Sequence, residues 1–419
     1  MAIDTPMLHV VAVGSVDDGK STLIGRLLHD TGHLTSDQIE AVAEASRKRG
    51  RKGIDLALLT DGLRAEREQG ITIDVAYRSF DANGRRILLG DAPGHVQYTR
   101  NMVTAAAGAD AAILLVDAKN GTTAQTRRHL AICGMLGVRD VIACVNKIDL
   151  VDYDEARFHE IAEELTASCA AIDGPRITPI PLSALNGVNL TERSPETPWY
   201  EGPTVLEVLH DLDPPVAETA FRMPVQWVVR HDDGEHDIRG LAGRIDSGLV
   251  TVGDEIVALP SGATSRIARI DVLGDERETA TAPLSVTLHL ETDIDVSRGD
   301  VIALAATPPQ VATRLRATVA WLDEQPLRVP ARLEARQGAR TVPVIVDELQ
   351  ERLELDTMEH VPADVLEAND LGIITLHAAQ PLVLEPYAEN RAMGSMVLID
   401  PATNRTVAAV MVDQVLIDA

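Results

Sequence analysis

The stretch Val10-Val11-Ala12-Val13-Gly14-Ser15-Val16-Asp17-Asp18-Gly19-Lys20-Ser21-Thr22 decides the fold of the first part of this chain. An apolar, β-branched run ends at Gly14, and helical spacing begins at Thr22. Between them lies the pattern G-x-x-x-x-G-K-S, whose backbone N–H groups face one concavity beside a helix N-terminus. The alternative is a plain glycine turn, but the order of strand, loop and helix predicts a loop that binds the phosphates of a nucleoside triphosphate.

This phosphate loop supplies the first candidate site residues. Lys20 is expected to reach the β- and γ-phosphates and to act in catalysis, and the Ser21 hydroxyl is expected to bind Mg²⁺. The predicted phosphate-binding residues of the loop are Gly14, Ser15, Val16, Asp17, Asp18, Gly19, Lys20, Ser21 and Thr22.

Length and composition limit the class of protein. A chain of 419 residues is too long for one core, so about two to four domains are expected. No apolar run reaches the roughly 18 residues of a membrane helix, and the first residues lack an export signal, so we expect a cytoplasmic protein without membrane contact. The 3 cysteines lack metal-ligand spacing and are expected to be buried, small apolar residues in a reducing compartment. The net charge of −26 argues against nucleic acid as a partner, although a local basic patch is compatible with it.

Residues 1–213 alternate strand and helix patterns, which predicts an α/β domain with a parallel sheet and crossover helices. The polar stretch between His29 and Gly70 includes a basic segment, Arg47–Lys52, that is expected to be solvated. The predicted strands are Ile73–Phe80, Ile87–Leu89, Ala111–Val116, Val141–Val145 and Ile177–Pro181. One predicted helix follows the phosphate loop and ends near His29, and the other predicted helices cover Tyr98–Ala107, Thr126–Leu136 and Asp154–Cys169.

The sequence pattern changes near Pro214-Pro215, and Pro308-Pro309 marks a second break. Beyond 213, short β-branched segments are separated by Gly, Asp and Pro, which predicts two mainly antiparallel β-barrel domains, 214–308 and 309–419. The predicted strands are Met223–Arg230, Gly240–Ile245, Thr251–Leu259, Thr264–Val272, Leu284–Leu290, Asp300–Ala303, Arg314–Leu322, Thr341–Leu349, Leu371–Leu376 and Met396–Ile399.

A second motif, Asp91-Ala92-Pro93-Gly94, directly follows a predicted strand. A carboxylate at this place can hold Mg²⁺ through water, and the Gly94 N–H can meet the γ-phosphate because glycine has no Cβ to clash. His95 comes next and is expected to orient the attacking water, although a lone histidine is more often structural. We predict phosphate contacts by Asp91, Ala92, Pro93, Gly94 and His95, and a metal contact by Asp91.

Two further motifs are expected to read the base. Asn146-Lys147-Ile148-Asp149 ends an apolar strand, and the Asp149 carboxylate can accept both N1–H and the 2-amino group of guanine, whereas adenine lacks the 2-amino group. Asn146 is expected to position loop and base, and Lys147 to lie over the ring. The backbone N–H groups of Ser183-Ala184-Leu185 can donate to guanine O6, so guanine-binding residues are predicted at Asn146, Lys147, Asp149, Ser183, Ala184 and Leu185.

Thr72, in Gly70-Ile71-Thr72-Ile73, is the last candidate. A threonine before the second strand can complete the Mg²⁺ shell only when a γ-phosphate is present, so we predict a metal-binding and catalytic role for it. This would make His29 to Thr72 an order–disorder switch.

The motif loops resemble those of translation-factor GTPases such as elongation factor Tu. More specifically, the segments 61–78 and 95–102 resemble the GTPase subunit of heteromeric sulfate adenylyltransferase, the ATP sulfurylase of sulfate assimilation. The resemblance extends to Pro198–Thr204, Leu241–Gly248 and Asn390–Ser395, and so covers nearly the whole chain.

This resemblance implies that the chain binds and hydrolyses GTP with Mg²⁺, and that hydrolysis drives the formation of adenylylsulfate and pyrophosphate from ATP and sulfate. It also implies a catalytic subunit 2 as partner, in a heterodimer or higher assembly, on which adenylyl transfer takes place. After Ser21 the chain has no second G-x-x-x-x-G-K-[ST], so no fused adenylylsulfate kinase is expected. Val96 stands where the family has glutamate, which is expected to affect the switch beside His95.

Two alternatives stay open at this point. The motif loops alone also allow a translational GTPase that engages tRNA or the ribosome, although the acidic balance speaks against it. The chain is also compatible with a regulatory module that senses GTP with negligible turnover. Activation of GTP turnover by a sulfurylase partner would support the sulfate adenylyltransferase interpretation against both of these alternatives.

Overall fold

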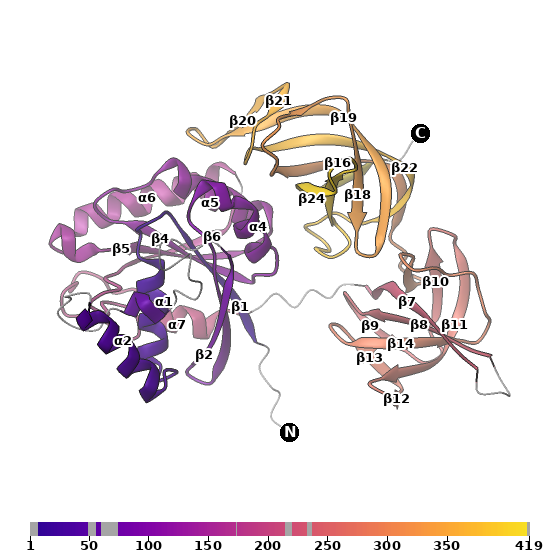
Figure 1. Cartoon of the computed structure of the whole chain (residues 1–419), viewed down its shortest axis with the longest axis horizontal. Coiled ribbons are helices and arrows are strands. Elements are labelled where there is room, and N and C mark those ends of the chain that lie inside the picture. The colour runs from indigo at the N-terminus through magenta and orange to yellow at the C-terminus, as the bar shows by residue number, and fades with distance from the viewer. Residues whose placement is uncertain are drawn as a thin grey trace. The chain divides into compact units, whose positions relative to one another are not determined.

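The computed structural model describes residues 7–48, 56–59, 74–172, 174–213, 220–232 and 237–416. The chain divides into two compact units, Met1–Pro215 with Glu354–Glu359, and Val216–Leu353 with His360–Ala419. The first unit contains an α/β sheet and the second contains two closed β-sheets, so the predicted fold class is confirmed (Figure 1). The predicted domain boundaries stay predictions, and Thr72, Pro214-Pro215 and most of the basic segment Arg47–Lys52 lie outside the described residues.

A six-stranded sheet with the order β2-β3-β1-β4-β5-β6 forms the centre of the first unit. All of its pairs are parallel except β2–β3. Every residue of β4 is buried, as expected for a strand that is covered on both faces. The strands are β1 (Leu8–Gly14), β2 (Ala76–Ala82), β3 (Arg85–Asp91), β4 (Ala111–Asp117), β5 (Asp140–Asn146) and β6 (Arg176–Pro181).

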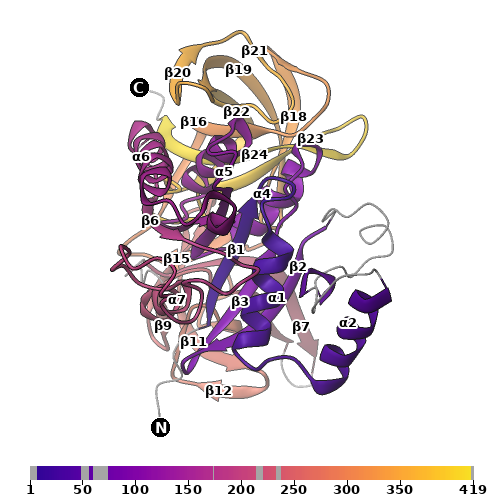
Figure 2. The ribbon, with the colours of Figure 1, turned by 90° about the vertical axis from the view of Figure 1, so that its left-hand side faces the viewer.

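Helices flank this sheet on both faces (Figures 1 and 2). Helices α1 (Lys20–Asp30) and α7 (Val205–Asp211) share one hydrophobic core with β1, β3, β4 and β5. The opposite face carries the helices α4 (Thr99–Ala107), α5 (Ala124–Met135) and α6 (Glu155–Ala171). The described part of this unit also contains the helix α2 (Ser36–Lys48) and three short 3₁₀ segments, η1 (Leu56–Leu59), η2 (Val96–Tyr98) and η3 (Ile148–Val151).

One edge of the predicted parallel sheet is antiparallel. β2 pairs antiparallel with β3 through a turn at Asn83 and Gly84, whose φ angles are 54° and 94°. Asn-Gly is the pair that two-residue hairpin turns favour, because both positions need a positive φ. The stretch His29–Gly70, predicted only to be polar, contains helix α2.

Two closed β-sheets make up the second unit. In each, six of seven strands form a ring, closed by the β10–β11 pair in the first barrel and by the β18–β19 pair in the second. The first contains β7 (Arg222–Asp232), β8 (Asp237–Arg244), β10 (Glu255–Leu259), β11 (Ala263–Val272), β14 (Ser285–Leu290) and β15 (Val301–Leu304), with β12 (Asp275–Arg277) and the pair β9 (Leu249–Thr251) and β13 (Thr279–Thr281) outside the ring.

The second barrel is built from longer strands. Its ring contains β16 (Gln310–Trp321), β18 (Ala331–Gln337), β19 (Arg340–Glu354), β22 (Leu371–Leu384), β23 (Ser395–Asp400) and β24 (Arg405–Leu416), with β17 (Leu327–Arg328), β20 (Glu359–Pro362) and β21 (Val365–Leu366) outside it. One predicted strand is wrong: Thr251–Leu259 is interrupted at Gly253, whose φ of 91° breaks the ladder into β9 and β10. Among the ring strands, β18 and β24 were not predicted.

The two barrels of this unit share a buried interface. Arg222 of the first barrel pairs with Glu385 of the second at 2.6 Å, and their side chains are only 4% and 16% exposed. Asn390 donates to Glu385 Oε2 at 2.9 Å and to Ser247 Oγ at 3.1 Å. The segments Leu241–Gly248 and Asn390–Ser395, which carry part of the family resemblance, therefore meet at this interface. An apolar cluster extends it, with Val257, Leu259, Val301, Ala303, Val383 and Met393.

Cys133, Cys144 and Cys169 are free and buried, which confirms that part of the prediction. Burial raises the pKa of each thiol above its ordinary value. Within the described ranges, no helix combines the length and the apolar character that a membrane crossing requires.

We expect Glu385→Ala to lower the free energy of unfolding of the barrel unit by about 3 kcal/mol, because it leaves the Arg222 guanidinium buried without its carboxylate. The matched control is Glu255→Ala. Glu255 pairs with Arg266 at 3.1 Å, but both side chains are about half exposed (54% and 52%), so a loss below about 1 kcal/mol is expected. Urea unfolding followed by tryptophan fluorescence compares the two; equal losses would contradict the importance given to the buried pair.

Candidate functional site

The predicted motifs gather at one edge of the sheet of the first unit. Strands β1, β3, β4, β5 and β6 run parallel, so their carboxyl ends meet at the same edge. The phosphate loop follows β1, the motif Asp91-Ala92-Pro93-Gly94 begins at the last residue of β3, Asn146 ends β5, and Ser183 follows β6. Strand order thus brings together motifs that lie up to about 170 residues apart in the chain.

The phosphate loop is held by its own side chains and by Asn146. Ser15 N–H donates to Asp18 Oδ2 at 2.7 Å, and Asn146 Nδ2 donates to the Asp18 carbonyl at 2.6 Å. Gly19 has a φ of 96°, and a Cβ there would lie 2.5 Å from Asn146 Nδ2. Burial raises the pKa of Asp18, against the opposing effect of its hydrogen bond from Ser15.

Lys20 is the buried cation of this loop. It is 7% exposed, and its ammonium donates to the carbonyls of Gly14 at 2.8 Å and Ser15 at 3.2 Å. Burial lowers the pKa of Lys20, while the negative charges of Asp91 and Asp18 act in the opposite direction. A buried ammonium at a strand-to-helix loop fits a phosphate ligand, whose charge would compensate its own.

The turn after β3 lies directly against this loop. A Cβ at Gly94 would stand 2.4 Å from the Gly14 carbonyl oxygen and 2.6 Å from Lys20 Nζ, so only glycine fits without displacement. Asp91 is 3% exposed, and Ala92 N–H donates to the Ala12 carbonyl at 3.1 Å. These contacts place a buried carboxylate, Asp91, and the backbone of Gly94 beside the phosphate loop, which suits a Mg²⁺–triphosphate ligand.

His95 caps the short helix η2. Its Nδ1 accepts the Gln97 N–H at 3.2 Å, and its ring meets the Tyr98 ring edge-on at 6.2 Å between centroids. The side chain is half-buried, so one end of the imidazole is fixed by protein while the residue still reaches solvent.

The base-reading motifs are joined by the Asn146 side chain. Its Oδ1 accepts the Ala184 N–H at 2.9 Å, while its Nδ2 holds the phosphate loop as described above. Lys147 has a φ of 59°, and its ammonium pairs with Asp117 Oδ2 at 2.8 Å. Ser183 and Ala184 are buried, whereas the Leu185 side chain is 67% exposed.

Comparison with known proteins assigns the family. The family model "Elongation factor Tu GTP binding domain" matches residues 5–215, and "GTP-eEF1A C-terminal domain-like" matches residues 314–413. Sulfate adenylyltransferase subunit 1 of Bacteroides fragilis is 43% identical over 410 residues, which cover 97% of this chain and 86% of that protein. The chain belongs to the sulfate adenylyltransferase subunit 1 family.

Two further relatives place this member of the subunit 1 family among its neighbours. Sulfate adenylyltransferase subunit 1 of Alteromonas mediterranea is 42% identical and covers 99% of this chain and 88% of that protein. The "Bifunctional enzyme CysN/CysC" of Xylella fastidiosa is 47% identical, but this chain spans only 66% of its length. Because such bifunctional relatives exist, the expected absence of a fused kinase stays a prediction. The translation-factor alternative has less support.

In this subunit 1 family member, the structure brings together most of the predicted site residues. The phosphate loop, Asp91 to His95, Asn146 to Asp149 and Ser183 to Leu185 share the carboxyl edge of the sheet. Thr72 lies outside the described residues. Among the described residues, no group of three or more His, Cys, Asp or Glu side chains could hold a metal ion. The individual roles stay predictions.

Sequence reasoning missed Gln125, at the start of α5. Its Nε2 lies 3.4 Å from the Gly94 carbonyl oxygen and 3.0 Å from His129 Nε2, and its Oε1 accepts a hydrogen bond from Arg128 at 2.8 Å. Burial, with the charges of Lys20 and Arg128, lowers the pKa of His129 to about 3, so its neutral ring can accept from Gln125. No motif signals this contact, since it joins an ordinary helix start to a turn 31 residues earlier.

The buried His129 should make stability depend on pH. Its pKa is about 3 in the folded chain and 6.5 ordinarily, so between these values the unfolded chain binds more protons. Lowering the pH from 6.5 towards 3 is therefore expected to reduce the free energy of unfolding, by up to about 1.4 kcal/mol per pH unit from this group. His129→Gln should remove that part of the slope in urea titrations.

The control for this pH dependence is His159→Gln. His159 lies on α6 with a side chain that is 58% exposed, so its replacement should leave the slope unchanged. If the His129→Gln protein has the same pH slope of the unfolding free energy as the unchanged chain, this would contradict the neutral, buried state assigned to the His129 ring.

Proposed function

We propose that this chain binds GTP with Mg²⁺ and hydrolyses it as a subunit of sulfate adenylyltransferase. Hydrolysis drives the formation of adenylylsulfate and pyrophosphate from ATP and sulfate on the catalytic subunit 2. The observation that carries the proposal is the buried Lys20 ammonium, held by loop carbonyls against Gly94, in a chain of the subunit 1 family.

The phosphate loop and the turn at Gly94 supply the γ-phosphate site. Lys20 and the loop N–H groups hold the β- and γ-phosphates, and the Gly94 N–H contacts the γ-phosphate when that group is present. Ser21, Thr72 and, through water, Asp91 would hold the metal. When bound, Mg²⁺ neutralises charge that develops on the phosphate oxygens.

The carboxyl edge of β5 and β6 supplies the guanine site. Asp149 accepts N1–H and the 2-amino group, and the segment Ser183 to Leu185 donates to O6 from a backbone N–H other than that of Ala184, which Asn146 Oδ1 already accepts. Both contacts discriminate against adenine, because a charged acceptor and backbone donors would be left unpaired. Asn146 supports this site through its bond to the Ala184 N–H at 2.9 Å.

His95 orients the attacking water at the γ-phosphate. Its Nδ1 already accepts the Gln97 N–H, which leaves the other ring nitrogen for the water. Val96, next to it, is 37% exposed, so the position of the family glutamate is apolar and near solvent in this chain.

The reaction that GTP hydrolysis drives takes place on a partner subunit. Adenylyl transfer belongs to subunit 2, and this chain contributes the energy of GTP hydrolysis through a complex of the two. Its acidic net charge of −26 disfavours nucleic acid as an additional partner. The three buried, free cysteines are compatible with the proposed cytoplasmic location.

Asp149→Asn tests the base-reading assignment. The variant is expected to lose about tenfold or more in GTP affinity and to gain in XTP affinity, because xanthine has a carbonyl where guanine has its amino group. Isothermal titration with both nucleotides measures the change. Asp152→Asn is the matched control, since Asn tolerates its positive φ of 53° and should leave affinity unchanged. Undiminished GTP binding by Asp149→Asn would contradict the assignment.

The coupling is tested in the complex with subunit 2 by sulfate-dependent pyrophosphate release, with and without GTP. GTP should stimulate release with the unchanged chain, and Lys20→Ala should abolish GTP binding and stimulation together. Arg176→Ala, which removes an 81%-exposed side chain at the opposite edge of the sheet, should behave like the unchanged chain. GTP-driven synthesis that survives Lys20→Ala would overturn the role of the loop. GTP turnover that subunit 2 does not change would instead favour a GTP-sensing module.

A further inference from the structure

Lys147, the residue proposed to lie over the guanine ring, is held by a residue that no motif identified. Its ammonium pairs with Asp117 Oδ2 at 2.8 Å, across 30 residues of chain. Lys147 is 30% exposed at its side chain, whereas the Asp117 side chain is 8% exposed. A lysine stem has several free torsions, so a fixed anion at its tip decides where the stem lies.

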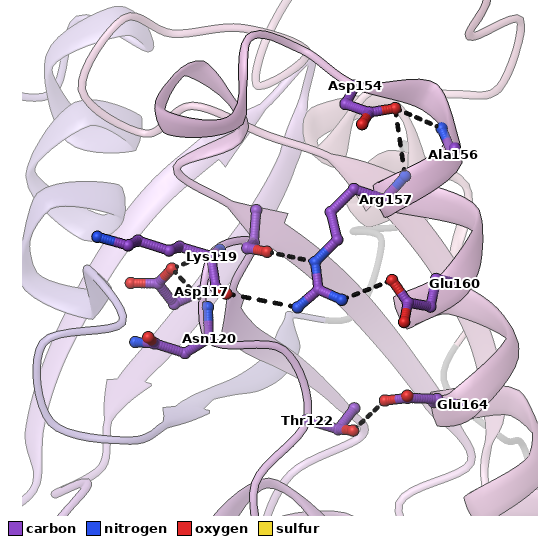
Figure 3. A network of polar contacts seen from close by, with 10 residues as sticks. Asp117, Lys119, Asn120, Thr122, Asp154, Ala156, Arg157, Glu160 and Glu164 are labelled. Carbon is purple, nitrogen blue, oxygen red and sulfur yellow. Dashed lines mark hydrogen bonds and ion pairs between the residues drawn. The ribbon is translucent and has the colours of Figure 1, made fainter.

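Asp117 is itself fixed by its own loop. It is the last residue of β4, and its Oδ1 accepts the Lys119 N–H at 2.8 Å and the Asn120 N–H at 3.3 Å (Figure 3). One carboxylate oxygen therefore closes the loop after β4, and the other is available to the lysine. These bonds and that from Lys147 lower the pKa of Asp117 despite the opposing effect of burial.

Arg157 of α6 holds the same loop from the other side. Its Nε donates to the Ala118 carbonyl at 2.8 Å and its Nη2 to the Lys119 carbonyl at 3.5 Å, while Nη1 pairs with Glu160 at 2.6 Å (Figure 3). A Cβ at Gly121 would lie 2.7 Å from Arg157 Nη2, so the loop approaches the guanidinium closely. Asp154 fixes the start of this helix by accepting the Arg157 N–H at 3.4 Å.

We propose that Asp117 is a positioning residue for guanine nucleotide binding, which holds the Lys147 stem against the base, and that Arg157 stabilises the loop that presents Asp117. This inference rests on the proposed GTP-binding function. Asp117 is proposed to act through the Lys147 stem and not on the edge of the base that Asp149 reads. It therefore strengthens binding of GTP and GDP equally and leaves the preference for guanine unchanged.

The test is Asp117→Asn in the full chain. Asparagine keeps an oxygen for the Lys119 N–H, so the loop can close, but the charge that holds Lys147 is lost. The affinities for GTP and GDP, measured with fluorescent nucleotide analogues, are expected to fall by the same factor of about ten, mainly through faster release. The ratio of GTP to XTP affinity should stay constant.

A double-mutant cycle with Lys147→Met separates positioning from a general loss of structure. If Asp117 acts through Lys147, then Asp117→Asn should weaken binding no further in a chain that already carries Lys147→Met. Independent, additive losses would overturn the proposal, as would unchanged affinity in the single variant. Arg157→Lys replaces the planar fork of the guanidinium by a single ammonium, so it should give a smaller loss that also disappears in the Lys147→Met chain. This variant provides the test if Asp117→Asn does not fold.

Asp140→Asn is the matched control. Asp140 lies at the opposite end of β5 and pairs with Arg176 at 2.8 Å, so its replacement removes an ion pair of the same sheet without affecting Lys147. It should leave nucleotide affinity unchanged. If the unchanged chain does not bind GTP, the proposed function is wrong. If the chain binds GTP in a Lys20-dependent manner but Asp117→Asn does not change nucleotide affinity, only the positioning inference is wrong.

Discussion

The side-chain amide of Asn146 is the interaction on which the site of the first unit depends. Its Nδ2 donates to the Asp18 carbonyl and its Oδ1 accepts the Ala184 N–H, at 2.6 and 2.9 Å. The residue is 2% exposed, so water does not compete for these bonds. One planar group thereby sets the distance between the phosphate loop and the loop after β6. Any ligand that spans phosphates and base must match that distance.

Hydrogen bonds from side chains to loop backbone groups recur around this edge of the sheet. A polar side chain satisfies backbone groups of a loop that follows a strand: the buried Asp117 does so for its own loop, and the half-buried Arg157 does so for that loop from α6. Such contacts order loops that would otherwise have many conformations, because each hydrogen bond replaces one to water and fixes the position of a backbone group. In the second unit, an ion pair between two side chains, Arg222 and Glu385, joins the two barrels instead.

Much of the fold was predictable because its signals are local. Apolar runs, helical spacing and the glycine loop identified the sheet, and short β-branched segments identified the barrels. Where prediction failed, a local signal was usually present but unused: Asn83-Gly84 indicates a hairpin, and Gly253 interrupts a ladder. The site contacts of Gln125 and Asp117 are different, since neither residue belongs to a pattern of fixed spacing.

The sequence by itself determined which loops carry the chemistry, because a phosphate loop, a D-x-P-G turn and an N-K-x-D segment need particular residues at particular spacings. It also determined that these loops follow strands of one α/β sheet. The tertiary structure alone decided which side chains hold the loops together. Asn146 meets Asp18 across 128 residues and Lys147 meets Asp117 across 30. Such meetings depend on strand order and on the exclusion of water at the sheet edge, and no local pattern encodes either of them.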